Sequence, residues 1–324
     1  MKIRHIVLAA FTATALSAAS SAQAQDFPSK PLTLLVPFPP GGSTDMVARV
    51  IADKLQAGLG RTVVVENRPG AGAQIAASVL MKANADGHTL MIGDTGALAV
   101  NTTLYPKLSF DPLKDFAPVT ALVSTPLVLV VAPGSKAAKA SDIVAQAKQS
   151  PRGLSYASQG VGTIGHLLAE QLRVRSGGQF HHVAYKGSAP ALQEVIGGHV
   201  DMLFDPVSTA WPMITSGKVK ALGVAAARRS PALPQVPTLA EAGVPGVEGR
   251  VWWGMVVKAG TPPAAVDRLN AEIRKALASA DVAKRFAEIG LESTPMSPQR
   301  FGEFLKTEVA RWAPLVKASN ASVD

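Results

Sequence analysis

Short apolar runs alternate with amphipathic stretches along most of this chain, a pattern that is typical of layered α/β folds. Residues 32–37, with the sequence LTLLVP, predict a buried strand, and the stretch after it repeats apolar residues every four positions from Val47, which predicts a helix. Two further strands are expected at residues 62–66 and 90–93, with a helix over residues 74–83 between them. The order strand, helix, strand, helix, strand predicts a parallel, doubly wound sheet.

A second set of strands and helices is expected from residue 127, where the strand 127–132 is its first member. After about residue 250 the pattern changes, because an apolar strand over residues 251–257 is followed by two helices. These helices are expected to begin at the N-cap residues Thr261 and Ser297, each of which is followed by a proline. A chain that builds one sheet, builds another and then returns in helices predicts two α/β lobes, with crossing strands between them and a ligand cleft where they face each other.

The first 24 residues are expected to be an export signal. The segment opens with Lys2 and Arg4, continues in a short apolar run, and ends in the small-x-small sequence Ala22-Gln23-Ala24. Its apolar run is too short for a transmembrane helix. We therefore expect cleavage after Ala24, a mature chain of residues 25–324, and a periplasmic location.

Composition and the absence of certain motifs argue against several kinds of functional site. The 324 residues include no cysteine, which excludes disulfides, cysteine-ligated zinc, iron–sulfur clusters and a thiol nucleophile. The formal net charge is +9, but the basic residues are spread out with no aromatic-interleaved run, so no nucleic-acid partner is expected, and a small anion fits the charge equally well. No Walker A or H-E-x-x-H motif occurs, and Gly70 and Gly72 give only a weak dinucleotide signal because Ile75 stands where a third glycine would be. No cofactor and no metal are expected.

Two loops share one design, in which a strand is followed by glycines, a hydroxyl residue and a helix. The first loop comprises residues 37–45, and the second comprises residues 158–163. A helix N-terminus offers unpaired N–H groups and the positive end of the helix dipole, so both loops favour an anion, and the two together could hold the two ends of a dicarboxylate. The alternative is that both are ordinary turns whose side chains only cap helices. The ligand-binding residues predicted from these loops are Phe38, Gly42, Ser43, Thr44, Ser158, Gly160, Gly162 and Thr163.

A secreted serine hydrolase that uses Ser158 is the competing enzyme hypothesis. Ser158 stands between a strand and a helix like a nucleophile elbow, but Tyr156 occupies the position where G-x-S-x-G requires its first glycine. His166 and Asp205 could complete a triad only in the reverse of the order expected for that fold, because the histidine precedes the acid. We therefore expect no enzyme activity and no catalytic residue, and the hydrolase remains the alternative.

Seven blocks of this sequence resemble a known family, and together they cover essentially the whole mature chain. The chain is similar to the Bug (Bordetella uptake gene) family of periplasmic substrate-binding proteins of tripartite tricarboxylate transporters. The blocks occur in the following order: PFPPGGSTDMVAR, TVVVENRPGAGAQIA, DGHTLMIG, LYPKLSFDPLKDFAPV, VAYKGSAPALQEVIGGHVDMLFD, VPTLAEAGVPG and GTPPAAVDRLN.

The resemblance implies a periplasmic binding protein of type II, with two doubly wound α/β lobes that close over a small carboxylate. Such ligands include di- and tricarboxylates, acidic amino acids and aromatic acids, and the receptor delivers them to an inner-membrane permease with a large and a small subunit. We expect a monomer, with residues 26–125 plus 250–324 in domain 1 and residues 126–249 in domain 2.

The resemblance also adds site residues beyond the two loops. Thr95 and Gly96 after the third strand, and Asp205 after the strand DMLF, fall where the family's variable ligand contacts lie. His166, on the helix that follows the second loop, is included among the predicted ligand-binding residues. An acidic Asp205 that faces the cleft would favour a ligand bearing an amine or a hydroxyl group.

Overall fold

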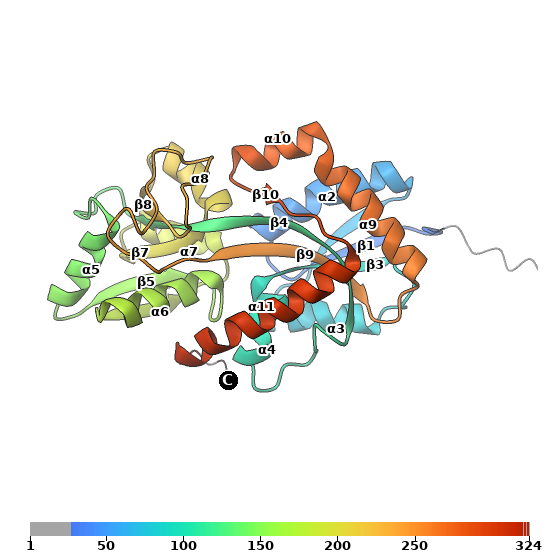
Figure 1. Ribbon diagram of the computed structural model, residues 1–324, viewed down its shortest axis with the longest axis horizontal. Coiled ribbons are helices and arrows are strands. Elements are labelled where there is room, and N and C mark those ends of the chain that lie inside the picture. Colours follow the sequence, from blue (N-terminus) through green and yellow to red (C-terminus); the bar gives the residue numbers. More distant parts are fainter. Residues whose placement is uncertain (1–26, 320, 322, 324) are drawn as a thin grey trace, which may run out of the picture.

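The computed structural model describes residues 27–319, 321 and 323, and the expected signal peptide, residues 1–24, lies outside these residues. The described part of the chain forms two α/β lobes that lie side by side and are bridged by two long strands, β4 and β9 (Figure 1). The predicted fold class is confirmed. The strands form one continuous ten-stranded sheet rather than two separate sheets. Eight of them follow the order β2-β1-β3-β9-β4-β7-β5-β6, and β8 and β10 pair with β4 outside this order.

The first lobe contains the parallel strands that the sequence predicts. β1 pairs with both β2 and β3 in parallel, and β9 is added to β3 in the antiparallel direction. Val36 at the end of β1 is fully buried, so the chain leaves the sheet directly beneath the loop that leads into helix α2. The strands of this lobe are β1 (Leu32–Val36), β2 (Val63–Asn67), β3 (Thr89–Asp94), β9 (Arg250–Lys258) and the two-residue β10 (Glu292–Ser293).

β4, Phe116–Val131, is the strand that belongs to both lobes. Residues 116–126 pair with β9, and residues 127–131 pair with β7 and β8. The expectation that a strand begins at residue 127 was wrong, because the strand begins eleven residues earlier at Phe116. Pro118 and Pro126 interrupt the apolar run in the sequence, but the ladder tolerates Pro118 at one of two register shifts.

The second lobe is built on three parallel strands next to β4. β5 pairs in parallel with β6 and β7, and β7 and β8 both run antiparallel to β4. Parallel strands place their carboxyl ends on one side of the sheet, so the loops that follow β5, β6 and β7 gather there. These strands are β5 (Leu154–Ser158), β6 (Phe180–Ala184), β7 (Met202–Pro206) and β8 (Lys220–Val224).

Helices cover both faces of the strands (Figure 1). α11 begins at the predicted cap Ser297, whose hydroxyl accepts a hydrogen bond from the Arg300 N–H, whereas the cap of α9 is Pro262 rather than the predicted Thr261. The helices are α2 (Ser43–Leu59), α3 (Gln74–Lys82), α4 (Asn101–Leu104, preceded by a π-helical segment Gly96–Val100), α5 (Ala140–Gln149), α6 (Ile164–Ser176), α7 (Ser188–Ile196), α8 (Val207–Thr215), α9 (Pro263–Ala278), α10 (Ala280–Glu288) and α11 (Pro298–Ala318).

The C-terminal helix α11 runs along the molecule and contacts both lobes. It packs on β4 and on the π-helical segment, and it also touches α6 of the second lobe. Within the described residues, no helix is both long and apolar enough to cross a membrane.

Candidate functional site

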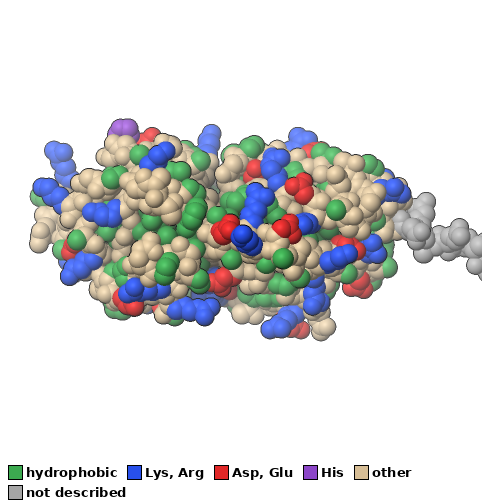
Figure 2. Space-filling model, turned by 90° about the horizontal axis from the view of Figure 1, so that it is seen from above, with side chains coloured by type: hydrophobic (Ala, Val, Ile, Leu, Met, Phe, Trp, Pro, Cys, Tyr) green, Lys and Arg blue, Asp and Glu red, His purple; other side chains and the backbone are tan. Residues whose placement is uncertain are grey.

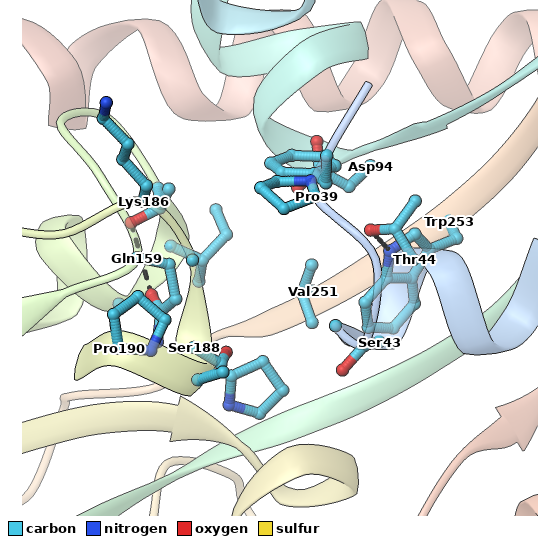
Figure 3. Close-up of a pocket in the computed structure, with 18 of the residues that line it drawn as sticks. Pro39, Ser43, Thr44, Asp94, Gln159, Lys186, Ser188, Pro190, Val251 and Trp253 are labelled. Atoms are coloured by element: carbon cyan, nitrogen blue, oxygen red, sulfur yellow. Dashed lines mark hydrogen bonds between the residues drawn. The ribbon is translucent and has the colours of Figure 1, made fainter. Parts of the chain in front are cut away.

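A cleft lies between the two lobes and is lined by residues from both of them (Figure 3). It encloses about 730 Å³ of space free of protein atoms, part of which is open to solvent. The first lobe contributes Phe38, Pro39, Pro40, Gly42, Ser43, Thr44, Asp94, Val251 and Trp253, and the second lobe contributes Leu127, Gln159, Thr163, Ile164, Gly165, Lys186, Gly187, Ser188, Ala189, Pro190 and Pro206.

Three helix N-termini open on this cleft. α2 begins at Ser43 in the first lobe, and α6 and α7 begin at Ile164 and Ser188 in the second, and all three residues line the cavity. The residues before them, Gly42, Thr163 and Gly187, make no side-chain capping hydrogen bond within the described chain. The first-turn N–H groups therefore remain available to a ligand, and the positive ends of the three helix dipoles favour an anion.

The wall of the first lobe is fixed by hydrogen bonds to the first turn of α2. The indole nitrogen of Trp253 donates to the hydroxyl oxygen of Thr44 at 2.8 Å, which ties α2 to β9 (Figure 3). Across the cleft, the hydroxyl groups of Ser43 and Ser208 lie 3.0 Å apart and share a hydrogen bond. These bonds fix the first turn of α2 against β9 and bring it into contact with α8 of the second lobe.

Asp45, also in the first turn of α2, does not line the cleft. Its carboxylate accepts hydrogen bonds from the backbone of Gly41 and from the side chains of Arg49 and Asn67. Burial alone would raise the pKa of this carboxyl, but these hydrogen bonds outweigh burial and lower it. The ionised carboxylate therefore holds the glycine turn of the first loop in place and stays away from an incoming anion.

The wall of the second lobe depends on Gln159. Its amide nitrogen donates at 2.8 Å both to the carbonyl of Phe204 and to the carboxylate of Asp205, and its oxygen accepts from the Thr163 hydroxyl at 3.3 Å. Its backbone carbonyl accepts from the Gly187 N–H at 3.1 Å, so one residue joins the loops that begin α6, α7 and α8. This cross-linking keeps the two helix N-termini of the second lobe in fixed relative positions.

Asp205 is fully buried behind Gln159 and is absent from the residues that line the cleft. The condition under which it would favour an amine or a hydroxyl group, a carboxylate that faces the cleft, is not met in this structure. Burial raises its pKa to about 6, although hydrogen bonds from Thr209, Ser188 and Gln159 oppose the shift. Its effect on ligand choice stays a prediction, and such an effect would act through Gln159 and Ser188, which hydrogen-bond Asp205 and line the cleft.

A stack of three aromatic rings, two of them buried and that of His182 half-buried, lies beneath the second loop. The rings of His166 and His182 are stacked with centroids 4.0 Å apart, and the ring of Tyr156 stacks on His182 at 4.9 Å. The backbone N–H of Gly162 donates to Nδ1 of His166 at 3.0 Å, and the Tyr156 hydroxyl donates to Glu170 at 2.6 Å. The stack therefore supports the loop from below through a histidine nitrogen that must be unprotonated.

Ser158 also belongs to this buried layer. It is fully buried, it shares a 2.6 Å hydrogen bond with Nε2 of His182, and its hydroxyl oxygen accepts the Gly160 N–H at 3.1 Å. The histidine beside it is thus His182 rather than His166, and Asp205 hydrogen-bonds Gln159 and Thr209 instead of either histidine. The triad considered for a hydrolase is not assembled.

The structure brings together five of the residues that the sequence predicts as ligand contacts. The five that line the cleft are Phe38, Gly42, Ser43, Thr44 and Thr163. The other seven do not line it and stay predictions as ligand contacts: Thr95, Gly96, Ser158, Gly160, Gly162, His166 and Asp205. Thr95, for example, is fully buried, and its hydroxyl oxygen accepts the backbone N–H of Trp252 at 2.9 Å.

Four residues that line the cleft were not among the predicted ligand contacts, namely Asp94, Gln159, Trp253 and Ser188 at the start of α7. A signal for α7 was present, because the strand that ends at Ala184 is followed by Gly187, Ser188 and a helix, the same order as in the two predicted loops. No local signal marks Asp94 and Trp253, which meet through the antiparallel register of β3 and β9. Within the described residues, no group of three or more His, Asp or Glu side chains could hold a metal ion.

The buried histidine gives a testable pH dependence. Burial, followed by the neighbouring His182, lowers the pKa of His166 to about 4, whereas an unfolded histidine titrates near 6.5. The unfolded chain therefore binds the proton more readily. Neutral His166 makes its full contribution to the free energy of unfolding above about pH 6.5, and this contribution is lost as the pH falls towards 4. We expect wild type to lose about 3 kcal/mol more than His166→Gln between pH 7 and pH 4, measured by urea unfolding. The exposed His199→Gln is the control, and parallel pH profiles of wild type and His166→Gln would contradict the prediction.

In the view of Figure 2 the molecule is narrower between the two lobes than across either of them. Charged side chains of both signs are scattered over both lobes on this face. The basic side chains on this face do not gather into one stripe.

Comparisons with known proteins agree with this geometry. Residues 47–321 match the family described as "Tripartite tricarboxylate transporter family receptor". Protein BugT of Bordetella pertussis is 37% identical over 98% of this chain and 97% of its own length. Among solved structures, Rpa4515 of R. palustris with adipate has a TM-score of 0.88 and 37% identity, covering 92% of this chain and 99% of that one. MatC of Rhodopseudomonas palustris with bound malate has a TM-score of 0.82 and 34% identity, covering 90% of this chain and 100% of that one. Together with the two-lobed fold and its interlobe cleft, these matches establish that the chain belongs to the tripartite tricarboxylate transporter receptor family, which includes the Bug proteins.

Proposed function

We propose that this protein captures a small carboxylate by closing its two lobes over it and then delivers it to an inner-membrane permease with a large and a small subunit. The observation that carries the proposal is the set of three helix N-termini without side-chain caps, α2 from one lobe and α6 and α7 from the other, around a single cleft. A carboxylate that accepts N–H hydrogen bonds from both sides would favour the closed arrangement over an open one.

The proposal includes export and a division into two domains. The signal peptide would be removed after Ala24, leaving a monomeric periplasmic chain of residues 25–324. We place domain 1 at residues 26–125 plus 250–324 and domain 2 at residues 126–249. The change of pairing partners within β4 between Pro126 and Leu127 supports the first boundary, and the pairing of Arg250 with Pro126 supports the second.

The ligand classes we propose are di- and tricarboxylates, acidic amino acids and aromatic acids. Two similar structures are named with carboxylates, adipate for Rpa4515 and malate for MatC. Apolar side chains such as Phe38, Leu127 and Val251 line much of the cleft, so a carbon chain or ring could pack between the polar ends of the ligand. The loops around Phe38–Thr44 and Ser158–Thr163 would bind the carboxylate groups.

The test is thermal unfolding of residues 25–324, freed of any co-purified ligand by unfolding and refolding, against a panel of such carboxylates. A ligand present at about 100 times its dissociation constant adds about 2.7 kcal/mol of apparent stability. Stabilisation by a compound that is recovered unchanged supports the receptor. Conversion of that compound to a product, abolished by Ser158→Ala, would instead support the hydrolase.

Trp253 supplies a direct optical readout of binding. Its side chain lines the cleft and donates to Thr44 in the first turn of α2, so a bound ligand would change its surroundings. We expect ligand to change the intrinsic fluorescence of the wild type, and we expect Trp253→Phe to lose most of that change while still being stabilised by the ligand. Trp211→Phe is the matched control, because Trp211 does not line the cleft. An equal loss of signal in both variants would contradict this assignment.

A further inference from the structure

The lining of the cleft contains one carboxylate and one ammonium group among the residues that the structure describes. Asp94 stands at the end of β3 in the first lobe, and Lys186 stands in the loop before α7 in the second. In Figure 3 the Lys186 amine is directed away from the cavity, whereas Asp94 lies beside Pro39 at its edge. An acidic residue at the wall of an anion-binding cleft needs an explanation, because it repels the ligand's own carboxylates.

Asp94 has no cationic partner in the described part of the chain, where no Lys, Arg or His nitrogen lies within 4.0 Å of its carboxylate. One carboxylate oxygen accepts the backbone N–H of Ala97 at 2.8 Å. Burial raises the pKa of Asp94 to about 6, and backbone hydrogen bonds from Ala97 and Gly96 only partly oppose the shift. A ligand that fills the cleft would remove still more water from a carboxylate that is already incompletely solvated, and that loss needs a donor to offset it.

The two walls of the cleft therefore differ in chemistry. The second lobe presents the N–H groups of α6 and α7, which are donors and suit a ligand carboxylate. The first lobe presents the N–H groups of α2 and, elsewhere on the same wall, the acceptor Asp94. A ligand that matches both walls carries a carboxylate and, elsewhere on its chain, a group that donates a hydrogen bond.

We propose that Asp94 accepts a hydrogen bond from a hydroxyl or ammonium group of the bound ligand, so that the cleft prefers a hydroxy- or amino-carboxylate over the acid of equal length without that group. This inference rests on the proposed function, because it concerns the ligand of the same cleft. It transfers to Asp94 the selective role that the sequence suggests for Asp205, which is buried behind Gln159.

A purely local role for Asp94 is the competing explanation, since its bond to Ala97 helps to begin the helical segment that leads into α4. Asp94→Asn separates the two explanations. The amide oxygen can still accept the Ala97 N–H, while the negative charge and one acceptor oxygen are lost. Asp281→Asn removes the same charge from an exposed side chain of α10 that does not line the cleft, and it serves as the matched control.

The experiment is isothermal titration of the ligand-free protein with two matched series: succinate, malate and aspartate, and glutarate, 2-hydroxyglutarate and glutamate. We expect wild type and Asp281→Asn to bind the hydroxy or amino member of at least one series roughly tenfold or more tightly than the unsubstituted acid. In Asp94→Asn, that ratio is expected to fall below about threefold, mainly because the unsubstituted acid binds better once the repelling charge is gone.

Two results would overturn the inference. The first is equal affinity of wild type for the substituted and unsubstituted members, and the second is a ratio that Asp94→Asn leaves unchanged. In both cases the receptor function survives, because carboxylates still bind. Absence of binding by any carboxylate of the wider panel would instead overturn the proposed function and this inference with it. Asp94→Ser, which keeps a shorter acceptor for Ala97, repeats the comparison if the asparagine variant does not fold.

Discussion

Gly162→Ala is expected to weaken carboxylate binding by between about 10- and 100-fold, because the added methyl group would block the contact between the lobes. A Cβ atom at Gly162 would overlap Cδ2 of Leu104, which lies in α4 of the first lobe and is only 2% exposed. Forcing an extra carbon into such a packed contact costs about 1–3 kcal/mol. The two residues lie in different lobes, so separating the lobes relieves the overlap, and the cost falls on the closed state.

The binding loss can be separated from the backbone strain of the substitution. Gly162 has φ +76°, and Gly177 in the same lobe has φ +65° with open space where a Cβ would stand, so Gly177→Ala reports the strain alone. Leu104→Ala in the Gly162→Ala background removes the overlap and should restore most of the affinity, whereas in the wild-type background it should change affinity little. Titration calorimetry of the four proteins measures the coupling between the two positions. Equal affinities of Gly162→Ala and Gly177→Ala would contradict the steric explanation.

The parts of the site that could be predicted from the sequence are those encoded in one short segment. The order of strand, glycine, hydroxyl residue and helix places Ser43 and Thr163 at helix N-termini, and both residues line the cleft. That pattern does not say which side of a strand end faces the cleft. Ser158 and Asp205 both stand at strand ends, yet both side chains are fully buried among partners from neighbouring loops.

The parts that could not be predicted depend on pairings between distant segments. Asp94 and Trp253 are register partners in the antiparallel pair β3 and β9, and no pattern within either strand specifies that pairing. Only the last part of the crossing strand β4 was predicted, because Pro118 and Pro126 in its first part are typical of a loop. The structure accommodates Pro118 through a register shift in the pairing of β4 with β9. The fold class was still predictable, since it follows from the order of elements rather than from their exact ends.

Glu308→Ala is expected to destabilise the protein by about 4 kcal/mol, because Glu308 is the buried acceptor that fastens α11 to β9. One carboxylate oxygen accepts the indole N–H of Trp252 at 2.7 Å and that of Trp312 at 3.0 Å, and the other is paired with Arg311 at 3.3 Å. Glu308 is 4% exposed, so truncation leaves two buried indole donors without a partner, each at a cost of about 1–3 kcal/mol, in addition to the space it empties. For a chain of this size the melting temperature should fall by roughly 6 °C.

Two variants on the same helix make the measurement of Glu308 specific. Glu303→Ala removes an exposed carboxylate from α11 and should change stability by less than about 0.5 kcal/mol. Glu308→Gln keeps an oxygen that can accept both indole N–H groups, so it should lose less than half as much stability as the alanine variant.

Trp252 and Trp253 are consecutive residues of β9, and the first is held by α11 while the second lines the cleft. Loosening Trp252 should therefore also disturb the α2 wall through the bond from Trp253 to Thr44, so Glu308→Ala should bind carboxylates more weakly than Glu303→Ala. Equal melting temperatures of the two alanine variants would show that α11 does not depend on the buried carboxylate.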